Sequence, residues 1–382
     1  MAKKKGNKLK TLGKFLLFAV TIASAVALLF SFLAKIFPPS FSSIIAYCGL
    51  LFPYLLTLNF VITIIWLVVD FTWALIPVTT ILLNVNNIDK HFQLRGTEKP
   101  EVCTNCLKVM SYNARAFNIY DKNQRAMNNR VSQFLQNEKP DILCIQEYSI
   151  DPTGRTGFNS TEAICEAMNI KDNEKTHKVL LRFKNKLGYR FGMAVFSKYR
   201  IVGGGYVDIN DSSSNKSMYV DIRFNGDTLR VYNVHLTSMH LDSTDYETGK
   251  ALWAGSYDST FNNKAQKLSN KITMAYVLRQ RQAKAVHAHI SECPYPVILC
   301  GDFNDSPASY SYNKIMHGLK DSFRGSGKGT GTTYLGKDFP SYRIGYIAHD
   351  KQFNDFQYTV CRDLDVSDHY PIYTYISIVK KN

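Results

Sequence analysis

Three apolar runs fill the first part of the chain. Residues 15–37 are apolar except for small hydroxyl residues and Lys35, and residues 44–69 form a second run that contains Pro53. Residues 71–83 form a shorter third run, which either crosses a membrane together with the asparagine-rich stretch up to residue 88 or lies at the interface. Because about 20 apolar residues are enough to cross a bilayer, the pattern predicts two or three transmembrane helices in residues 15–88.

The basic segment at residues 1–14 bears on the orientation. The positive-inside rule places it in the cytoplasm, so three crossings put the rest of the chain outside and two leave it inside. Trp66 and Trp73 flank Asp70 as aromatic residues do at a membrane surface. A cleaved signal peptide is the alternative, because Ala23-Ser-Ala25 resembles a cleavage site, but the apolar run continues past it. We predict a multi-pass membrane protein with three crossings and a non-cytoplasmic C-terminal domain.

Residues 102–382 alternate short apolar runs with helical patterns. Strands are predicted at 107–112, 141–145, 190–196, 219–224, 229–234, 297–300, 333–334, 342–347 and 371–378. Apolar residues at helical spacing predict helices around 127–135 and 268–290, and the polar stretch 242–263 is predicted to be a surface loop. Many strands with two helices predict a four-layer α/β/β/α sandwich, two packed sheets with helices outside, after the transmembrane helices.

Charge and cysteines add little to this picture. The net charge of the 382-residue chain is +15. Such a charge is compatible with a phosphate-bearing substrate or an anionic membrane surface, although taken alone it more often means only a well-solvated surface. Cys103-Thr-Asn-Cys106 is a weak zinc signal without a second pair. It would be able to form a disulfide if the domain is exported.

Polar side chains recur where the predicted strands begin or end. Seven such residues are Asn113, Glu147, His235, Asp302, Asn304, Asp368 and His369. Each alone is more often a turn residue, and Asp302 with Asn304 would suit an Asx turn after the strand 297–300. Together, carboxylate and amide oxygens without a thiolate suit a hard ion such as Mg²⁺. Two histidines beside them suit charge stabilisation on a phosphate.

These residues stand in sequence motifs whose order resembles that of the endonuclease/exonuclease/phosphatase superfamily. The chain is similar to a membrane-anchored, bacterial-type member of this superfamily. The resemblance spans residues 107–378. Its motifs are Ser111-Tyr-Asn113, Ile145-Gln-Glu147, Gly192-Met-Ala194, Asn233-Val-His235, Gly301-Asp-Phe-Asn304 and Ser367-Asp-His369.

The resemblance implies a role for each of the seven residues. Glu147 is expected to bind the catalytic metal with help from Asn113 and Asp368, the metal being Mg²⁺ with Mn²⁺ as an alternative. Asp302 is expected to orient or deprotonate the attacking water, and Asn304 to hold that water and the phosphate. His235 and His369 are expected to bind the phosphoryl oxygens. The implied reaction is in-line attack of water on a phosphodiester or phosphomonoester.

One motif departs from the family. The family pattern Arg-Ile-Asp-Tyr-Ile is here Arg343-Ile-Gly-Tyr-Ile347, and Gly345 offers no carboxylate to orient His369. Asp350, five residues on, faces the other way in a continuous strand. We therefore expect a less well-oriented His369, and a higher kcat in Gly345→Asp. A weakened or inactive relative that binds phosphate-bearing ligands is the alternative function.

The expected partners follow from these features. They are the lipid bilayer and a phosphate ester, whether nucleic acid, phospholipid or inositol phosphate, with no obligate protein partner evident. The stretch 242–263 contains Leu252, Trp253 and Tyr257 but also acidic and lysine residues, so it favours none of these substrates. We expect three segments in the chain: a basic tail at 1–14, a transmembrane region at 15–88 and an enzyme domain at 102–382.

Overall fold

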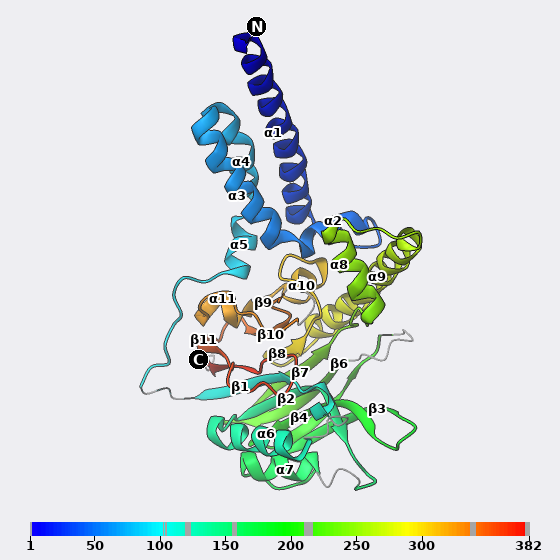
Figure 1. Cartoon of the computed structure of the whole chain (residues 1–382). Coiled ribbons are helices and arrows are strands. Elements are labelled where there is room, and N and C mark those ends of the chain that lie inside the picture. Colours follow the sequence, from blue (N-terminus) through cyan, green and yellow to red (C-terminus); the bar gives the residue numbers. More distant parts are fainter. Residues whose placement is uncertain are drawn as a thin grey trace.

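The computed structural model describes residues 2–101, 103, 105–118, 124–154, 159–209, 217–336 and 341–378. Figure 1 shows a group of N-terminal helices, in blue, that stands on a C-terminal α/β domain. We call helices α1–α5 the anchor. Their bounds are α1 Ala2–Leu33, α2 Ser43–Leu50, α3 Phe52–Val69, η1 Phe71–Ala74, α4 Leu75–Leu83 and α5 Val85–His91.

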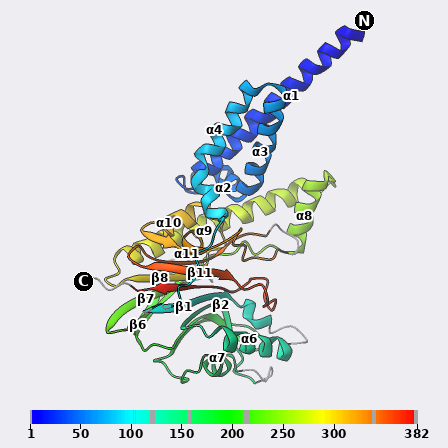
Figure 2. The same cartoon turned by 90° about the vertical axis from the view of Figure 1, so that its left-hand side faces the viewer.

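Two anchor helices are long and apolar enough to cross a membrane, Thr11–Leu33 within α1 and the whole of α3. The pair Phe71–Leu83 and Val85–His91 bends by 58° and would be a third span if it crosses as one. In Figures 1 and 2 the N-terminus lies at the end of the anchor far from the α/β domain. The predicted basic tail 1–14 has no separate structure, because α1 begins at Ala2.

The predicted second span at 44–69 is wrong in one respect, because it divides into two helices. Helix α2 ends at Leu50 and α3 begins at Phe52, with Pro53 in its first turn. Proline lacks an N–H and clashes with the preceding turn, so it begins a helix more readily than it continues one. Hydropathy does not register this break, because both sides of it are apolar.

Buried polar side chains hold the anchor helices to one another. Asn59 on α3 donates from Nδ2 to the carbonyl of Ser24 on α1 at 3.1 Å. Trp66 Nε1 donates to Thr21 Oγ1 at 2.8 Å, and Asn84 Nδ2 donates to the carbonyl of Leu28 at 3.1 Å. Interhelical hydrogen bonds of this kind fix helix pairs in an apolar setting. Helix α1 is therefore tied to α3 and to Asn84 at the end of α4.

Two six-stranded sheets form the centre of the α/β domain. The first has the order β11-β12-β1-β2-β4-β3 and the second β5-β6-β7-β8-β10-β9. Only β1–β2 and β7–β8 are parallel among the described pairs. The bounds are β1 Cys106–Asn113, β2 Ile142–Ile150, β3 His177–Lys184, β4 Arg190–Ser197, β5 Ile201–Val207, β6 Ser217–Phe224, β7 Asp227–His235, β8 Val297–Asp302, β9 Leu319–Asp321, β10 Gly345–Asp350, β11 Asn354–Val360 and β12 Ile372–Ser377.

Helices cover the outer faces of both sheets, so the predicted α/β/β/α sandwich is confirmed (Figure 2). One apolar core lies between the sheets, a second under α6 and α7, and a third under α9 and α10. The helix bounds are η2 Arg115–Asn118, α6 Gln124–Glu138, α7 Ser160–Met168, α8 Ser243–Ala254, α9 Phe261–Ser291, α10 Tyr310–Ile315 and α11 Ser322–Ser326.

The predicted surface loop at 242–263 is wrong, because most of it is helical. Asp242 and Asp245 form a capping box at the start of α8, each side chain accepting from the other's backbone N–H. A capping box satisfies two donors that a helix start otherwise leaves unpaired. Lys271 on α9 contacts both carboxylates, at 3.2 and 2.5 Å. Helix α8 is therefore set by polar contacts rather than by an apolar stripe.

The anchor is docked on the α/β domain through buried polar contacts. The hydroxyl of Tyr47 on α2 lies 2.7 Å from Thr273 Oγ1 on α9. Arg343 Nη2 donates to the carbonyl of Lys90 on α5 at 2.8 Å, and the same guanidinium pairs with the buried carboxylate of Asp321. Between the two parts, Cys103 and Cys106 form a disulfide. The anchor is therefore part of the folded domain's surface rather than a loose tether.

Candidate active site

The parallel strand pairs bring three of the predicted residues to one edge of the sandwich. Asn113 ends β1, and it pairs in register with Gln146 of β2. His235 ends β7 and is in register with Asp302, which ends β8. The carboxyl ends of parallel strands lie at the same edge of a sheet. The β1–β2 pair and the β7–β8 pair therefore each bring polar side chains to one edge of their own sheet, and these two edges meet at one side of the sandwich.

Glu147 lies in an irregular part of β2. The register of β2 against β4 shifts between Ile145 and Tyr148, and Glu147 has φ 49°. A bulge of this kind re-aims a side chain out of the ladder. A left-handed conformation is unusual for a glutamate and persists where surrounding structure holds it. The bulge leaves the Glu147 side chain 40% exposed at the edge of a buried strand.

Asp302 and Asn304 form the turn expected from their residue types. Asp302 Oδ1 accepts from the backbone N–H of Asn304 at 2.8 Å, and Asn304 has φ 50°. Asn304 Nδ2 donates to the carbonyl of Leu236 at 3.0 Å. The Asx turn therefore also shapes the candidate site, because it fixes the side chains of Asp302 and Asn304 beside the end of β8.

Asn113 connects the two sheets at this edge. Its Nδ2 donates to Glu147 Oε1 at 3.2 Å and to Asp302 Oδ2 at 2.9 Å. Its Oδ1 accepts from the backbone N–H of Arg115 at 3.1 Å. One amide therefore holds the carboxylates of Glu147 and Asp302 in a fixed relation, and its second oxygen lone pair is the one that remains for a cation.

Each of the two histidines lies beside one of these carboxylates. His235 Nε2 lies 3.8 Å from Glu147 Oε1, and this buried atom has no hydrogen-bond partner among the described residues. His369 Nδ1 lies 3.7 Å from Asp302 Oδ2, and its Nε2 lies 3.9 Å from Asp368 Oδ1. An unpaired buried nitrogen costs free energy, and a bound anion would supply the acceptor that His235 lacks.

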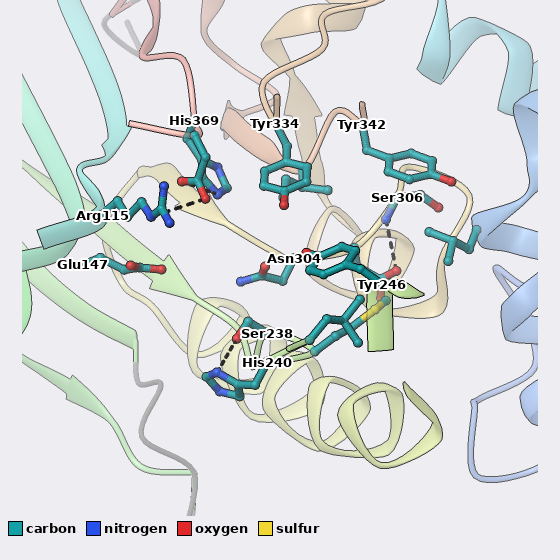
Figure 3. Close-up of a pocket in the computed structure, with 16 residues that line it drawn as sticks. Arg115, Glu147, Ser238, His240, Tyr246, Asn304, Ser306, Tyr334, Tyr342 and His369 are labelled. Carbon is teal, nitrogen blue, oxygen red and sulfur yellow. Dashed lines mark hydrogen bonds and ion pairs between the residues drawn. The ribbon is translucent and has the colours of Figure 1, made fainter. Parts of the chain in front are cut away.

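A cavity of about 250 Å³ opens over this edge. Glu147, Asn304, Asp368 and His369 line it, while Asn113, His235 and Asp302 are buried beneath. Figure 3 shows Glu147, Arg115 and His369 at one end of the cavity, Asn304 in the middle, and Tyr342 and Ser306 at the other end. The structure therefore brings all seven predicted site residues together.

Sequence reasoning missed several residues around the cavity. Arg115 follows Asn113 closely, has φ 44°, and places Nε 3.6 Å from Asp368 Oδ2. Tyr334 pairs with His369 as an isolated bridge, and their ring centroids are 5.1 Å apart. Burial, followed by the hydroxyl of Tyr246 on α8, raises the pKa of Tyr334 far above its usual value, so this phenol stays protonated. The position of Arg115, two residues after the end of β1, was the one available signal.

Two buried amides join the sheets directly below the site. Gln146 Nε2 donates to Asn233 Oδ1 at 2.7 Å, and Asn233 Nδ2 donates to the carbonyls of Ile145 and Ala194, both at 2.9 Å. Both amides belong to motifs that carry the family resemblance, yet nothing in the sequence gave them a role. They brace the strand ends that hold Glu147 and His235.

The expectation for Gly345 needs revision. Gly345 is in register with Asp302, and a Cβ at this position would lie 3.3 Å from Thr333 Oγ1, which already accepts from the N–H of Gly345 at 2.9 Å. The carboxylate near Nδ1 of His369 comes from Asp302 instead. His369 is therefore not without a neighbouring carboxylate, and Thr333 occupies space beside Gly345.

The donor set at the cavity fits a hard divalent cation. Glu147 and Asp368 present carboxylate oxygens to the cavity, and oxygen ligands with room for water suit Mg²⁺. Within the described ranges, a group of three His, Cys, Asp or Glu ligand atoms within 4.8 Å of one another occurs at Cys165, Asp172 and His177 on the α7–β3 side instead. The cavity is thus an open site, in which solvent or substrate would complete the coordination.

Comparisons with known proteins agree with the fold of the α/β domain. Residues 110–369 match the sequence pattern of the endonuclease/exonuclease/phosphatase family, and residues 13–91 match a domain of unknown function (DUF8431). No curated protein matches the sequence.

Two solved structures share the fold. A family protein from Bacteroides vulgatus has TM-score 0.50 and 15% identity, over 72% of this chain and 99% of that one. The human nocturnin catalytic domain, solved with bound sulfate, has TM-score 0.50 and 13% identity, over 73% and 97%.

Proposed function

Because the chain belongs to the endonuclease/exonuclease/phosphatase family, we propose that it is a membrane-anchored, divalent-metal-dependent phosphoesterase. One observation carries the proposal beyond family membership. Asn113 holds Glu147 and Asp302 in one hydrogen-bonded unit at a single cavity, and each of these carboxylates has a histidine beside it. Paired carboxylates beside two histidines suit phosphoryl transfer to water.

The reaction is hydrolysis by in-line attack. A water oxygen bonds to phosphorus while the ester P–O bond on the opposite side breaks. One proton of the water stays on the product phosphate and the other reaches the leaving oxygen. Asp302 orients this water or accepts its proton, and Asn304, which lines the cavity, holds the water and a phosphate oxygen. Fixing the nucleophile in this way lowers the entropic part of the barrier.

Glu147 would hold the metal, helped by Asp368 and the oxygen of Asn113. A bound Mg²⁺ or Mn²⁺ supplies positive charge that stabilises the phosphoryl oxygens as negative charge develops. The bulge that exposes Glu147 fits this role, because a metal ligand must point out of the strand ladder. Asp368 also faces Arg115, so the cation at residue 115 limits the net negative charge of the site.

His235 and His369 bind the phosphoryl oxygens. The buried Nε2 of His235 is unpaired within the described part of the chain and aims at the Glu147 side of the cavity. His369 shares the cavity wall with the protonated hydroxyl of Tyr334. Donors fixed where charge develops stabilise the transition state more than water does, since they need no reorganisation.

We place the enzyme domain on the non-cytoplasmic side of the membrane. Two helices are able to cross, and three segments run side by side if the bent pair at Phe71–Leu83 and Val85–His91 counts as one. The basic residues lie in the N-terminal part of α1, at the end remote from the α/β domain, so the positive-inside rule favours three crossings. The Cys103–Cys106 disulfide suits an oxidising compartment.

A weakened or inactive relative that binds phosphate-bearing ligands is the second candidate. Gly345 is the observation behind it, because the residue at this position carries no carboxylate. The carboxylate of Asp302 beside His369 counts in favour of an active enzyme. We therefore rank hydrolysis above binding alone.

A metal-dependent assay separates the two functions. The full chain in detergent is given bis(p-nitrophenyl) phosphate and p-nitrophenyl phosphate, with Mg²⁺, with Mn²⁺ and with EDTA. Wild-type protein should turn over at least one ester only with metal, and both Glu147→Ala and Glu147→Gln should abolish turnover and its metal dependence. Metal-stimulated turnover in Glu147→Gln would remove Glu147 from the metal site. Absence of turnover in the wild type would favour the binding-only relative.

A further inference from the structure

The anchor forms part of the cavity wall. Leu50, the last residue of α2, lines the same cavity as Glu147, Asn304 and His369. In Figure 3 the blue ribbon of the anchor borders the end of the cavity where Tyr342 and Ser306 lie, opposite Glu147 and Arg115. A segment of the membrane-associated helices therefore bounds the site that we assign to phosphoester hydrolysis.

The contact between α2 and the site is fixed by hydrogen bonds. Ser306 Oγ donates to the carbonyl of Gly49 at 3.2 Å, and both groups are buried. The backbone N–H of Ser40 donates to Gln280 Oε1 on α9 at 3.0 Å. Ser306 lies two residues after Asn304, so the anchor is bonded to the loop that carries a proposed phosphate-binding residue. The cavity consequently keeps one orientation relative to the transmembrane helices.

The lining changes character along the cavity. The end at Glu147 and Arg115 is charged, whereas the end at Tyr342 and Ser306 is bordered by the anchor. The lining also contains Asp305 and, between the two ends, the polar side chains of Ser238, His240 and Asn304. The apolar and aromatic lining residues include Leu50, Met239, Leu241, Tyr246, Tyr342 and Ile344. A phosphate with an attached apolar group would place its charge at one end and the apolar group at the other.

Exposed apolar side chains lie around α2 and at the end of α8. Phe41, Ile44 and Leu51, around α2, are 68%, 62% and 41% exposed. Leu252 on α8 is 62% exposed and Tyr257 is 60% exposed. Figures 1 and 2 both show α8 and α9 on the side of the domain that faces the anchor. Exposed apolar residues beside transmembrane helices mark a surface that contacts lipid.

We propose that the substrate is a phospholipid of the bilayer in which the chain is anchored. This proposal rests on the phosphoesterase function above. The phosphate lies among Glu147, Asn304 and His369, and the apolar part of the lipid leaves the cavity past Leu50 towards the membrane. Hydrolysis breaks one P–O ester bond of the lipid, and water supplies the oxygen that the phosphorus gains. A nucleic acid duplex fits less well, because its phosphates carry no apolar tail to lie along the lining at Leu50.

The test compares lipid with soluble esters on the reconstituted full chain. The protein is placed in vesicles of phosphatidylcholine and phosphatidylglycerol with Mg²⁺, and released phosphate and phosphorylated headgroups are followed by ³¹P NMR. The soluble probes are bis(p-nitrophenyl) phosphate and a DNA oligonucleotide. Cleavage of the phospholipid faster than of either soluble probe is the expected result.

One variant tests the route past Leu50. A charge in the apolar wall should oppose the lipid tail far more than a small soluble ester, so Leu50→Asp should lower the ratio of lipid to soluble-ester turnover about tenfold or more. Val202→Asp, at a 48% exposed apolar position on β5 that lies outside both the cavity lining and the apolar surface beside α2, is the control and should leave the ratio unchanged. Leu50→Met, which keeps the wall apolar, should show the wild-type ratio of lipid to soluble-ester turnover. Circular dichroism and thermal melting establish that each variant is folded.

The outcomes are distinguishable. Turnover of soluble esters without cleavage of the phospholipid overturns the lipid proposal and leaves the phosphoesterase standing. Faster cleavage of DNA than of lipid also overturns it. An unchanged ratio in Leu50→Asp shows that the lipid does not pass the anchor and overturns the proposed route. No turnover of any probe with metal, in folded protein, overturns the phosphoesterase function itself and the lipid proposal with it.

Discussion

Asp302 Oδ2 lies 3.7 Å from Nδ1 of His369, and the same oxygen accepts a hydrogen bond from Asn113 at 2.9 Å. The carboxylate beside this histidine thus comes from β8, whereas the family pattern places one on the neighbouring strand at the position of Gly345. Gly345 on β10 and Asp302 on β8 are in register. The carboxylate beside His369 thus comes from the strand next to the one that carries it in the family pattern.

Gly345→Asp is now expected to change kcat by less than about threefold, because Asp302 already lies beside His369 and because Thr333 crowds the new side chain. The measurement is steady-state kinetics on a soluble phosphoester. Gly345→Ala is the control for crowding alone. A gain of tenfold or more that disappears in a His369→Ala background would instead show that the two residues act as one unit, and that Asp302 does not orient the histidine.

His235→Ala should lower kcat by about 10²–10³-fold, the usual effect of removing one donor to a developing oxyanion. KM for a small ester should change much less. His240, which lies on the cavity rim and contacts Ser238 at 3.0 Å, provides the matched control, and His240→Ala should stay close to wild type. A loss of less than threefold in His235→Ala would place His235 outside the reaction.

Arg343→Met should destabilise the protein by about 3–5 kcal/mol, because it leaves the carboxylate of Asp321 buried without its partner. The control is Arg324→Met, which removes an exposed ion pair with Asp89 and should cost less than about 1 kcal/mol. Chemical denaturation of the full chain in detergent measures both. Equal effects of the two substitutions would mean that burial of the Arg343 pair does not matter.

Stability should fall as pH drops below about 6.5, in part through His177. Burial lowers the pKa of His177 below its ordinary value of 6.5, with Asp172 opposing the shift. The folded state therefore binds fewer protons than the unfolded state in this range, so acid favours unfolding. Burial lowers the pKa values of His287 and His289 in the same direction. His177→Gln should reduce the loss of melting temperature between about pH 7.5 and 5.5. An unchanged or steeper loss of melting temperature would show that His177 does not contribute to the acid sensitivity.

Topology has a direct reporter test. A C-terminal fusion that fluoresces only in the cytoplasm should be dark if three segments cross, because an odd number of crossings separates the two termini. A fusion to residue 40, after one crossing, should be dark as well, and a fusion to residue 70 bright. A bright signal from the C-terminal fusion means two crossings and places the enzyme domain in the cytoplasm.

The strands that carry the site were predictable, and some of the others were not. Strands β2 and β8 contain continuous apolar runs, at 142–145 and 297–300, that are buried on both faces, which is the clearest strand signal in a sequence. Strands β1 and β7 are mostly apolar but include polar residues such as Lys108 and Arg230. Strand β5 contains Gly203, Gly204 and Gly205, and β3 is rich in basic residues, so neither has such a run. Edge strands like these owe their structure to the neighbour they pair with rather than to their own composition.

The site residues were predictable from motif order, whereas their connections were not. Strand ends mark Asn113, His235 and Asp302, but the bond from Asn113 to both carboxylates depends on how two sheets pack. The role of Leu50 was hidden for a different reason. An apolar residue looks the same in a sequence whether it faces lipid, a protein core or a substrate. The break between α2 and α3, which leaves Leu50 at the end of a helix beside the cavity, is visible only in the structure.

The docking of the anchor ties folding to the order of synthesis. Ser306 and Gly49 are 257 residues apart in the chain, and Arg343 and Lys90 are 253 apart. The anchor is synthesised about 250 residues before these partners, and contacts of such long range form slowly. A truncated gene that starts after the anchor would produce a domain with Arg343 and Ser306 unpaired on their anchor side. Such a fragment is a poor expression target, and activity screens should begin with the whole polypeptide.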